Sequence, residues 1–221
     1  MIVHDEWLLT TARAALHLPT ATLVLADLHL GYERARHRAG EAVPGRPIDD
    51  ILSPLKPLLR ARQPRRMVIA GDLFEAMPDL DTATGLLAWF ARVGVELAAV
   101  VPGNHDGKLS GLAHLLPVCP DGFDVGGWRV LHGDGPLPDA NVVYGHVHPW
   151  VRWSSLLSGP CYLVAPARIV LPAFSTDAAG VNVVPGRKWG DHRCCVIAGD
   201  EVLDFGELRA LRKRMRPRMR K

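Results

Sequence analysis

The first half of the chain alternates between short apolar runs and segments with helical character. Continuous apolar runs of this length are typical of strands that are buried on both faces. We expect such strands at residues 21–26, 66–70 and 96–101. Helices are expected within residues 33–47, over residues 48–62 and 80–92, and around residues 110–116. This order of strands and helices predicts a sheet that is at least partly parallel.

The pattern changes after about residue 123, where strands follow one another with few helical segments between them. Turns rich in proline and glycine separate these apolar runs. Strands are expected at residues 128–131, 141–144, 161–174 and 193–205. The first twenty residues are expected to form an edge element that ends in a turn at Pro19. The two halves together predict a layered α/β fold, with an antiparallel sheet after the partly parallel one.

Length and composition fit one large domain, because 221 residues with 48% hydrophobic content can bury a substantial core. No apolar run approaches the roughly 20 residues that span a bilayer. The N-terminus carries His4, Asp5 and Glu6 in place of the basic start of a signal peptide. We therefore expect no membrane segment and a cytoplasmic location. The four cysteines lack metal-binding spacing and are expected to be reduced thiols.

The net charge of +3 is mild, and much of it comes from the C-terminal end. We divide the chain into a single domain, residues 1–208, and a basic tail, residues 209–221. Clusters of lysine and arginine attract the phosphate backbone of nucleic acids. The same composition is typical of a disordered, solubilising end, and the sequence leaves both interpretations open.

Five of the expected strands end in residue types that bind metal ions. In order along the chain these are Asp27 and His29, Asp72, Asn104 with His105, His132, and His146 with His148. Each group lies beside a glycine, which lets the backbone turn sharply. Ligand-binding residues of open α/β sheets gather at the carboxyl ends of strands. One such group is often an ordinary buried or surface histidine, but five in order indicate one converging site.

The motifs Asp-x-His, Gly-Asp, Gly-Asn-His-Asp, His-Gly-Asp and Gly-His-x-His follow one another over residues 21–150. In this they resemble the calcineurin-like metallophosphoesterases. Within that superfamily, residues 26–31, the His132-Gly-Asp block and residues 171–174 are similar to the bacterial ligase-associated DNA damage response endonucleases. The resemblance implies an α/β fold with four layers, an α/β/β/α sandwich of two mixed sheets flanked by helices.

The resemblance also implies a site for two metal ions. The first ion would take Asp27, His29 and His148, the second would take Asn104, His132 and His146, and Asp72 would bridge both. Carboxylate, amide and imidazole ligands without thiolate suit Mn²⁺ or Fe better than a structural zinc site. We expect two divalent ions, with Mn²⁺ as first choice and Fe or Zn as alternatives.

His105 directly follows a metal ligand, and the resemblance assigns it the role of general acid toward the leaving oxygen. For Asp106 two roles are open, the orienting partner of His105 or the N-cap of a helix. A basic stretch follows the first motif, and it is either a phosphate-contacting patch or a solvated charged face. Its candidate substrate-binding residues are Arg34, Arg36, His37 and Arg38.

We therefore expect a dinuclear metal-dependent phosphodiesterase, and a DNA endonuclease of bacterial DNA repair is the first hypothesis. One alternative is a phosphodiesterase or phosphatase for a small nucleotide, such as a cyclic nucleotide. An alternative from another class is a scaffold that kept the fold and lost turnover, but the presence of His105 and of every expected ligand argues against it. The narrower resemblance implies DNA, an ATP-dependent DNA ligase and a helicase as partners.

Overall fold

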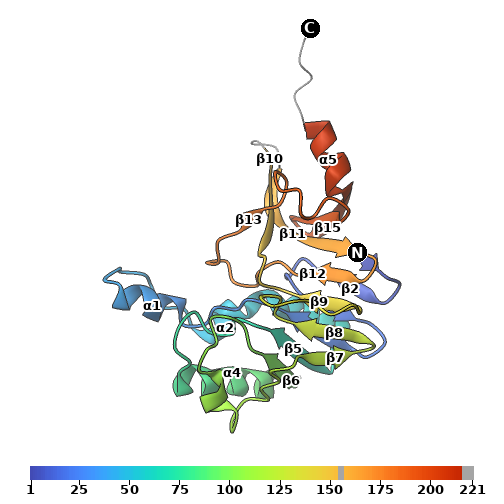
Figure 1. Cartoon of the computed structure of the whole chain (residues 1–221). Coiled ribbons are helices and arrows are strands. Elements are labelled where there is room, and N and C mark those ends of the chain that lie inside the picture. The colour runs from blue at the N-terminus through green and yellow to red at the C-terminus, as the bar shows by residue number, and fades with distance from the viewer. Residues whose placement is uncertain (154–156, 216–221) are drawn as a thin grey trace.

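The computed structural model describes residues 1–153 and 157–215, which form two β-sheets packed face to face (Figure 1). The first sheet has six strands in sequence order. Neighbours from β1 to β4 are antiparallel, and β4, β5 and β6 are parallel. The strands are β1 (Ile2–Val3), β2 (Trp7–Leu9), β3 (Ala15–His17), β4 (Thr22–Leu25), β5 (Arg66–Ala70) and β6 (Glu96–Val101).

The second sheet has nine strands and is also mixed. Its main order is β13-β10-β11-β12-β9-β8-β7, and β14 pairs with β11 and β15. Strands β12, β9 and β8 are parallel, so the sheet is not the purely antiparallel one that the strand-after-strand pattern predicts. The strands are β7 (Phe123–Val125), β8 (Trp128–Leu131), β9 (Val142–Tyr144), β10 (Pro149–Trp153), β11 (Leu157–Ala165), β12 (Arg168–Val170), β13 (Val181–Asn182), β14 (Arg193–Ala198) and β15 (Glu201–Glu207).

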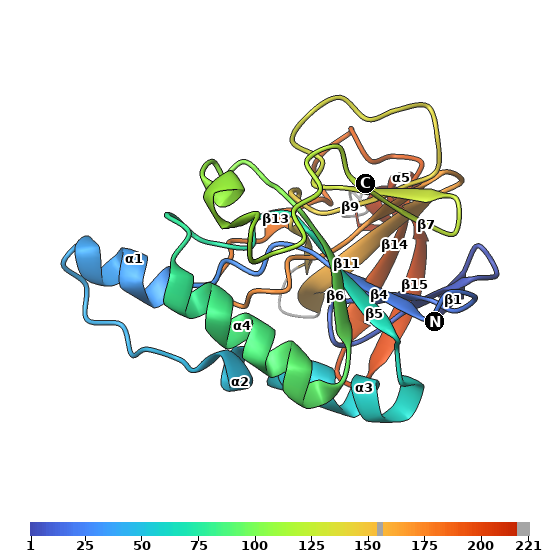
Figure 2. The same ribbon diagram turned by 90° about the horizontal axis from the view of Figure 1, so that it is seen from below.

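Helices flank the two sheets, as Figure 2 shows for the face covered by α2, α3 and α4. They are α1 (Tyr32–Arg38), α2 (Ile48–Ile51), η1 (Ser53–Leu55), α3 (Lys56–Arg62), α4 (Leu80–Val93), η2 (Leu109–Leu112) and α5 (Leu208–Met215). No helix among the described residues is long and apolar enough to cross a membrane.

Side chains of the parallel strands alternate between two apolar cores. Leu23 and Leu25 pack in the core beneath the helices, with Trp89 of α4. Val24 packs in the core between the two sheets, with Val143 of β9. A third core covers the outer face of the second sheet, where the buried side chains of Leu208 and Leu211 of α5 pack. This layering confirms the expected sandwich of two mixed sheets with flanking helices.

The predicted strands at residues 21–26, 66–70 and 96–101 and the helix at residues 80–92 are present with nearly the expected bounds. Residues 1–20 form three short strands where one edge element was expected, because runs of two or three residues are too short for a recognisable period. The helix expected around residues 110–116 is only the 3-10 turn η2, since Gly111 and Pro117 are poor helix residues.

Two of the long apolar segments are hairpins where one strand was expected. Residues 161–174 contain the end of β11 and all of β12, and residues 193–205 contain β14 and most of β15. The tight turns between them leave little trace in a hydrophobic profile. The free cysteines agree with the expectation of reduced thiols, because Cys161, Cys194 and Cys195 are buried and Cys119 is half-buried.

Candidate metal centre

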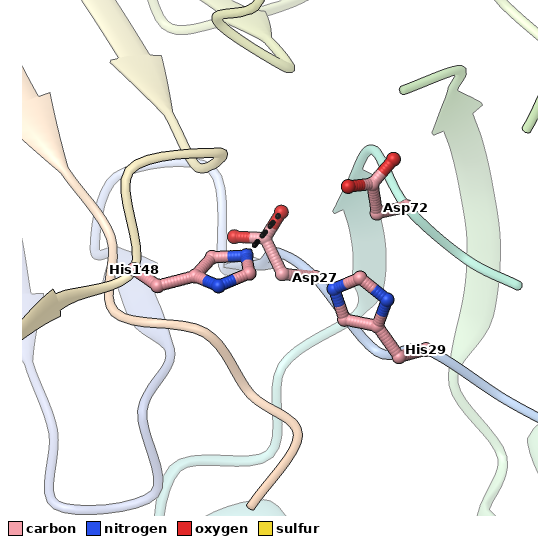
Figure 3. A group of neighbouring side chains, drawn as sticks. All are labelled: Asp27, His29, Asp72 and His148. Carbon is pink, nitrogen blue, oxygen red and sulfur yellow. Dashed lines mark ion pairs between the residues drawn. The ribbon is translucent and has the colours of Figure 1, made fainter. Parts of the chain in front are cut away.

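The carboxyl ends of strands from both sheets meet at one place. Asp27 follows β4, Asp72 follows β5, and Asn104 follows β6 of the first sheet. His132 and His146 follow β8 and β9 of the second sheet. Figure 3 shows that Asp27, His29, Asp72 and His148 come from three loops and lie close together.

The side chains form two adjoining groups that share Asp72. Asp27, His29, Asp72 and His148 make the first group, and Asp72, His132 and His146 make the second. Within each group the ligand atoms lie within 4.8 Å of one another. Asn104 belongs to the second group, because its Oδ1 is 3.1 Å from His132 Nε2, and His146 Nδ1 is 3.1 Å from the same nitrogen. The structure thus brings together all seven side chains expected to bind metal.

The chemistry of these groups fits divalent metal ions. The side chains of Asp27 and Asp72 are 0% and 3% exposed, and buried carboxylates need cations or several donors nearby. The Nε2 atoms of His29 and His148 are buried and have no hydrogen-bond partner among the described residues. An unpaired buried polar atom costs about 1–3 kcal/mol. A bound metal ion would supply the missing partner to both nitrogens.

The backbone is strained at these ligands. The described part of the chain has ten non-glycine residues with positive φ, and five of them are expected ligands: Asp27 at 57°, His29 at 50°, Asp72 at 46°, His146 at 64° and His148 at 47°. Such conformations cost about 1–3 kcal/mol each and concentrate at functional sites. The strain turns each side chain toward the common space directly after its strand.

Three motif glycines make room for the ligands. A Cβ atom on Gly71 would lie 2.0 Å from His132 Nδ1, and one on Gly103 would lie 2.2 Å from Asp72 Oδ1. A Cβ atom on Gly145 would lie 2.5 Å from Asp27 Oδ2. These three glycines are therefore required by close packing against the ligands.

The environment sets the charge of the histidines. Burial lowers the pKa of His29 and favours its neutral form, against the neighbouring carboxylates. Burial also acts to lower the pKa of His148, but the Asp27 carboxylate outweighs it, and the pKa is raised. His148 Nε2 lies 3.6 Å from Asp27 Oδ1. Neutral imidazole is the form that binds metal, so His29 is ready to act as a ligand at neutral pH.

His105 is exposed, and its ring lies 5.1 Å from the ring of His29 in the first group, in a further cluster with Glu75. Its backbone N–H donates to Asp72 Oδ1 at 2.9 Å, and its ring Nδ1 is 3.1 Å from the carbonyl oxygen of Glu75. Because a carbonyl oxygen only accepts, Nδ1 carries the proton, and Nε2 is left for a substrate.

Asp106 takes neither of the two roles considered for it. Its carboxylate accepts from the backbone N–H groups of Leu73, Phe74 and Gly103 at 3.0–3.1 Å. In the described structure it has no hydrogen bond with the ring of His105, and the N-cap of η2 is Lys108. Burial raises the pKa of Asp106, although the three donors act in the opposite direction. The residue ties the loop after β6 to the loop after β5.

Glu75 is a site residue that the sequence analysis did not single out. Its Oε2 is 2.7 Å from His29 Nδ1, and its carbonyl oxygen accepts a hydrogen bond from His105 Nδ1. A single residue thus contacts an expected metal ligand and the expected general acid. Its position three residues after Asp72 gives no signal on its own, because acidic residues are common on surfaces.

The basic residues after the first motif lie on α1, which projects from one side of the molecule (Figures 1 and 2). Arg34 is paired with Asp79 at 2.8 Å, and Arg36 is paired with Glu41. His37 contacts the carbonyl oxygen of Val43, and Arg38 is exposed. Because Arg34 and Arg36 are already paired with carboxylates, this stretch fits a solvated charged face better than a phosphate-binding patch.

A sandwich of two mixed sheets with paired carboxylate and histidine groups at its edge is the architecture of a metallophosphoesterase. The sequence profile of the calcineurin-like phosphoesterase family matches residues 20–165, and the chain belongs to this family. The crystal structure of the Pseudomonas putida nuclease MPE is similar in fold, with a TM-score of 0.70 and 22% sequence identity. The similarity covers 92% of this chain and 98% of that one. Among curated proteins, none matches the sequence.

Proposed function

We propose that this protein is a dinuclear metal-dependent phosphodiesterase that cleaves DNA, with Mn²⁺ as the first candidate metal. The observation that carries the proposal is the pair of ligand groups sharing Asp72. A carboxylate is suited to this shared position, because it offers two oxygens and a negative charge between two cations. Asp27, His29 and His148 would hold one ion, and Asn104, His132 and His146 would hold the other.

The metal ions and the residues around them would have different roles in the reaction. Two bound ions would offset the negative charge of the phosphodiester and supply a nucleophile from water at neutral pH. His105 would hold a proton at Nε2 for the leaving oxygen, with its ring oriented by the carbonyl oxygen of Glu75. Asp106 would hold the loop that carries Asp72 and the loop that carries His105 in fixed positions relative to each other. We assign Asp106 a positioning role for this reason.

The openness of the site favours a polymer substrate over a small nucleotide. Asn104 and His146 are exposed, so the second ligand group faces solvent, and His105 beside the first group is exposed as well. A nuclease is also the activity named for the similar Pseudomonas putida protein. The narrower sequence resemblance supports a role in DNA repair beside a ligase and a helicase.

A panel of metals and substrates tests the proposal. The metal-free protein would be supplied with Mn²⁺, Fe²⁺ or Zn²⁺ and given a chromogenic diester, single-stranded, nicked and duplex DNA, and 2′,3′-cyclic nucleotides. We expect metal-dependent cleavage of the diester and of DNA. We also expect His105→Ala to lower turnover of diesters with poor leaving groups about 10²- to 10⁴-fold while metal content stays unchanged. Cleavage of cyclic nucleotides alone would contradict the DNA assignment, and no cleavage with any metal would support the scaffold.

A further inference from the structure

Helix α5 is firmly docked on the outer face of the second sheet. The backbone N–H of Leu208 donates to the carbonyl of His192, and that of Arg209 donates to the carbonyl of Gly190, both at 2.9 Å. The side chains of Leu208 and Leu211 are buried in the outer core. Residues 208–215, most of which the sequence divided off as a tail, therefore form a fixed surface together with the loop before β14.

This surface carries cations without counter-charges. Arg187, Lys188, Lys213 and Arg214 are exposed, and the described residues form no ion pair with them. We call these four residues the basic face. The neighbouring Arg209 differs, because it is paired with Glu207 and Asp191. The sequence then continues with four further basic residues, Arg216, Arg218, Arg220 and Lys221.

An aromatic ring lies within the basic face. The Nζ atom of Lys188 is 4.8 Å from the centre of the Trp189 ring, which is half-buried. Cations beside an aromatic ring are typical of surfaces that follow a nucleic-acid backbone. Arg34 and Arg36 on α1, in contrast, are paired with Asp79 and Glu41. Four unpaired cations of the described chain thus lie together on α5 and the loop before β14, whereas two of the three arginines of α1 are paired with carboxylates.

We propose that the basic face binds the sugar-phosphate backbone of nucleic acid, at a stretch separate from the one that enters the metal centre. The inference rests on the proposed nuclease function. The metal centre would take only the phosphodiester that is cleaved, so the rest of a long polyanion needs cations elsewhere, and exposed unpaired ones attract it most strongly. An acidic membrane surface is a poorer fit. A helix that lies in a membrane presents its apolar side to lipid, and in α5 Leu208 and Leu211 already face the core.

Binding at different salt concentrations tests the inference. Labelled single-stranded and duplex DNA would be titrated with the full chain in EDTA, which prevents cleavage, between 50 and 200 mM salt. The variants are R187Q/K188Q and K213Q/R214Q. The matched control is R60Q/R62Q, which removes the same charge from exposed residues of α3, where the described residues likewise form no ion pair. Far-UV circular dichroism and thermal unfolding check that each variant folds.

We expect each basic-face variant to reduce the slope of log K against log salt by about 1–2, as each lost phosphate contact removes roughly 1. The control should change the slope far less, and hydrolysis of the chromogenic diester should be unchanged in all three. Wild-type binding by both variants, or equal losses in the control, would overturn the inference. So would basic-face-dependent binding of phosphatidylserine vesicles without binding of DNA. Failure of wild-type protein to hydrolyse the diester with any metal would instead contradict the proposed function, whatever the DNA titrations give.

Discussion

The substitution Gly103→Ala isolates the packing of the shared aspartate. Gly103 does not have a positive φ, so alanine meets no backbone penalty there. The added Cβ would lie 2.2 Å from Asp72 Oδ1 and 2.5 Å from Asp72 N, whereas ordinary contacts begin at 3.4 Å. Asp72 would have to move by more than about 1 Å, and a misplacement of that size costs roughly 10²-fold in rate. Overpacking of this kind also costs about 1–3 kcal/mol of stability.

The assay is hydrolysis of a chromogenic diester as a function of Mn²⁺ concentration, with urea unfolding measured in parallel. We expect Gly103→Ala to need more metal and to turn over about 100-fold more slowly, with the fold retained. Gly107→Ala is the matched control, because it lies four residues along the same loop and its Cβ would meet no atom within 4 Å. Equal activity of the two variants would refute the view that Gly103 makes room for Asp72.

Two further predictions concern Glu75 and His192. Removing the carboxylate with Glu75→Ala should weaken metal binding about 10- to 100-fold in a chelator competition assay, because His29 loses its orienting partner. Glu75→Gln, which keeps an acceptor, should lose less, and equal affinity of all three proteins would exclude a positioning role. Burial lowers the pKa of His192, so the folded protein binds fewer protons than the unfolded chain below pH 6.5. Stability present above pH 6.5 is therefore lost as the pH falls, and metal-free wild-type protein should lose more in Tm between pH 7.5 and 5.5 than His192→Gln.

The convergence of the expected ligands could be predicted from the sequence, because each one follows a strand end that is marked locally. An apolar run, a polar residue and a glycine mark the end of a strand such as β4 or β5, and parallel strands bring their ends together. The approximate bounds of α4 were also predictable, since its 14 residues span nearly four turns of regular spacing.

The contacts that support the expected ligands could not be predicted from the sequence, because they join segments that are distant in the chain. The donors to Asp106 include Leu73 and Phe74, which are more than thirty residues away in the chain. Glu75 meets His29 only because Leu30 and Phe74 bridge the two loops. The short strands at residues 1–17 escaped detection for another reason: they gain their stability from pairing in the sheet and carry no period of their own.

Each ligand group contains residues from both sheets, so metal ions bound there would hold the two sheets together. Asp27 and Asp72 follow strands of the first sheet, whereas His132 and His148 come from loops of the second. Ions that bind only the folded form add their binding free energy to its stability, so loss of metal would loosen one layer against the other. A methyl group removed from the core between the sheets, at Val24 or Val143, would change the packing that holds the two sets of ligands at their separation. We therefore expect substitutions in the apolar core to change the catalytic rate.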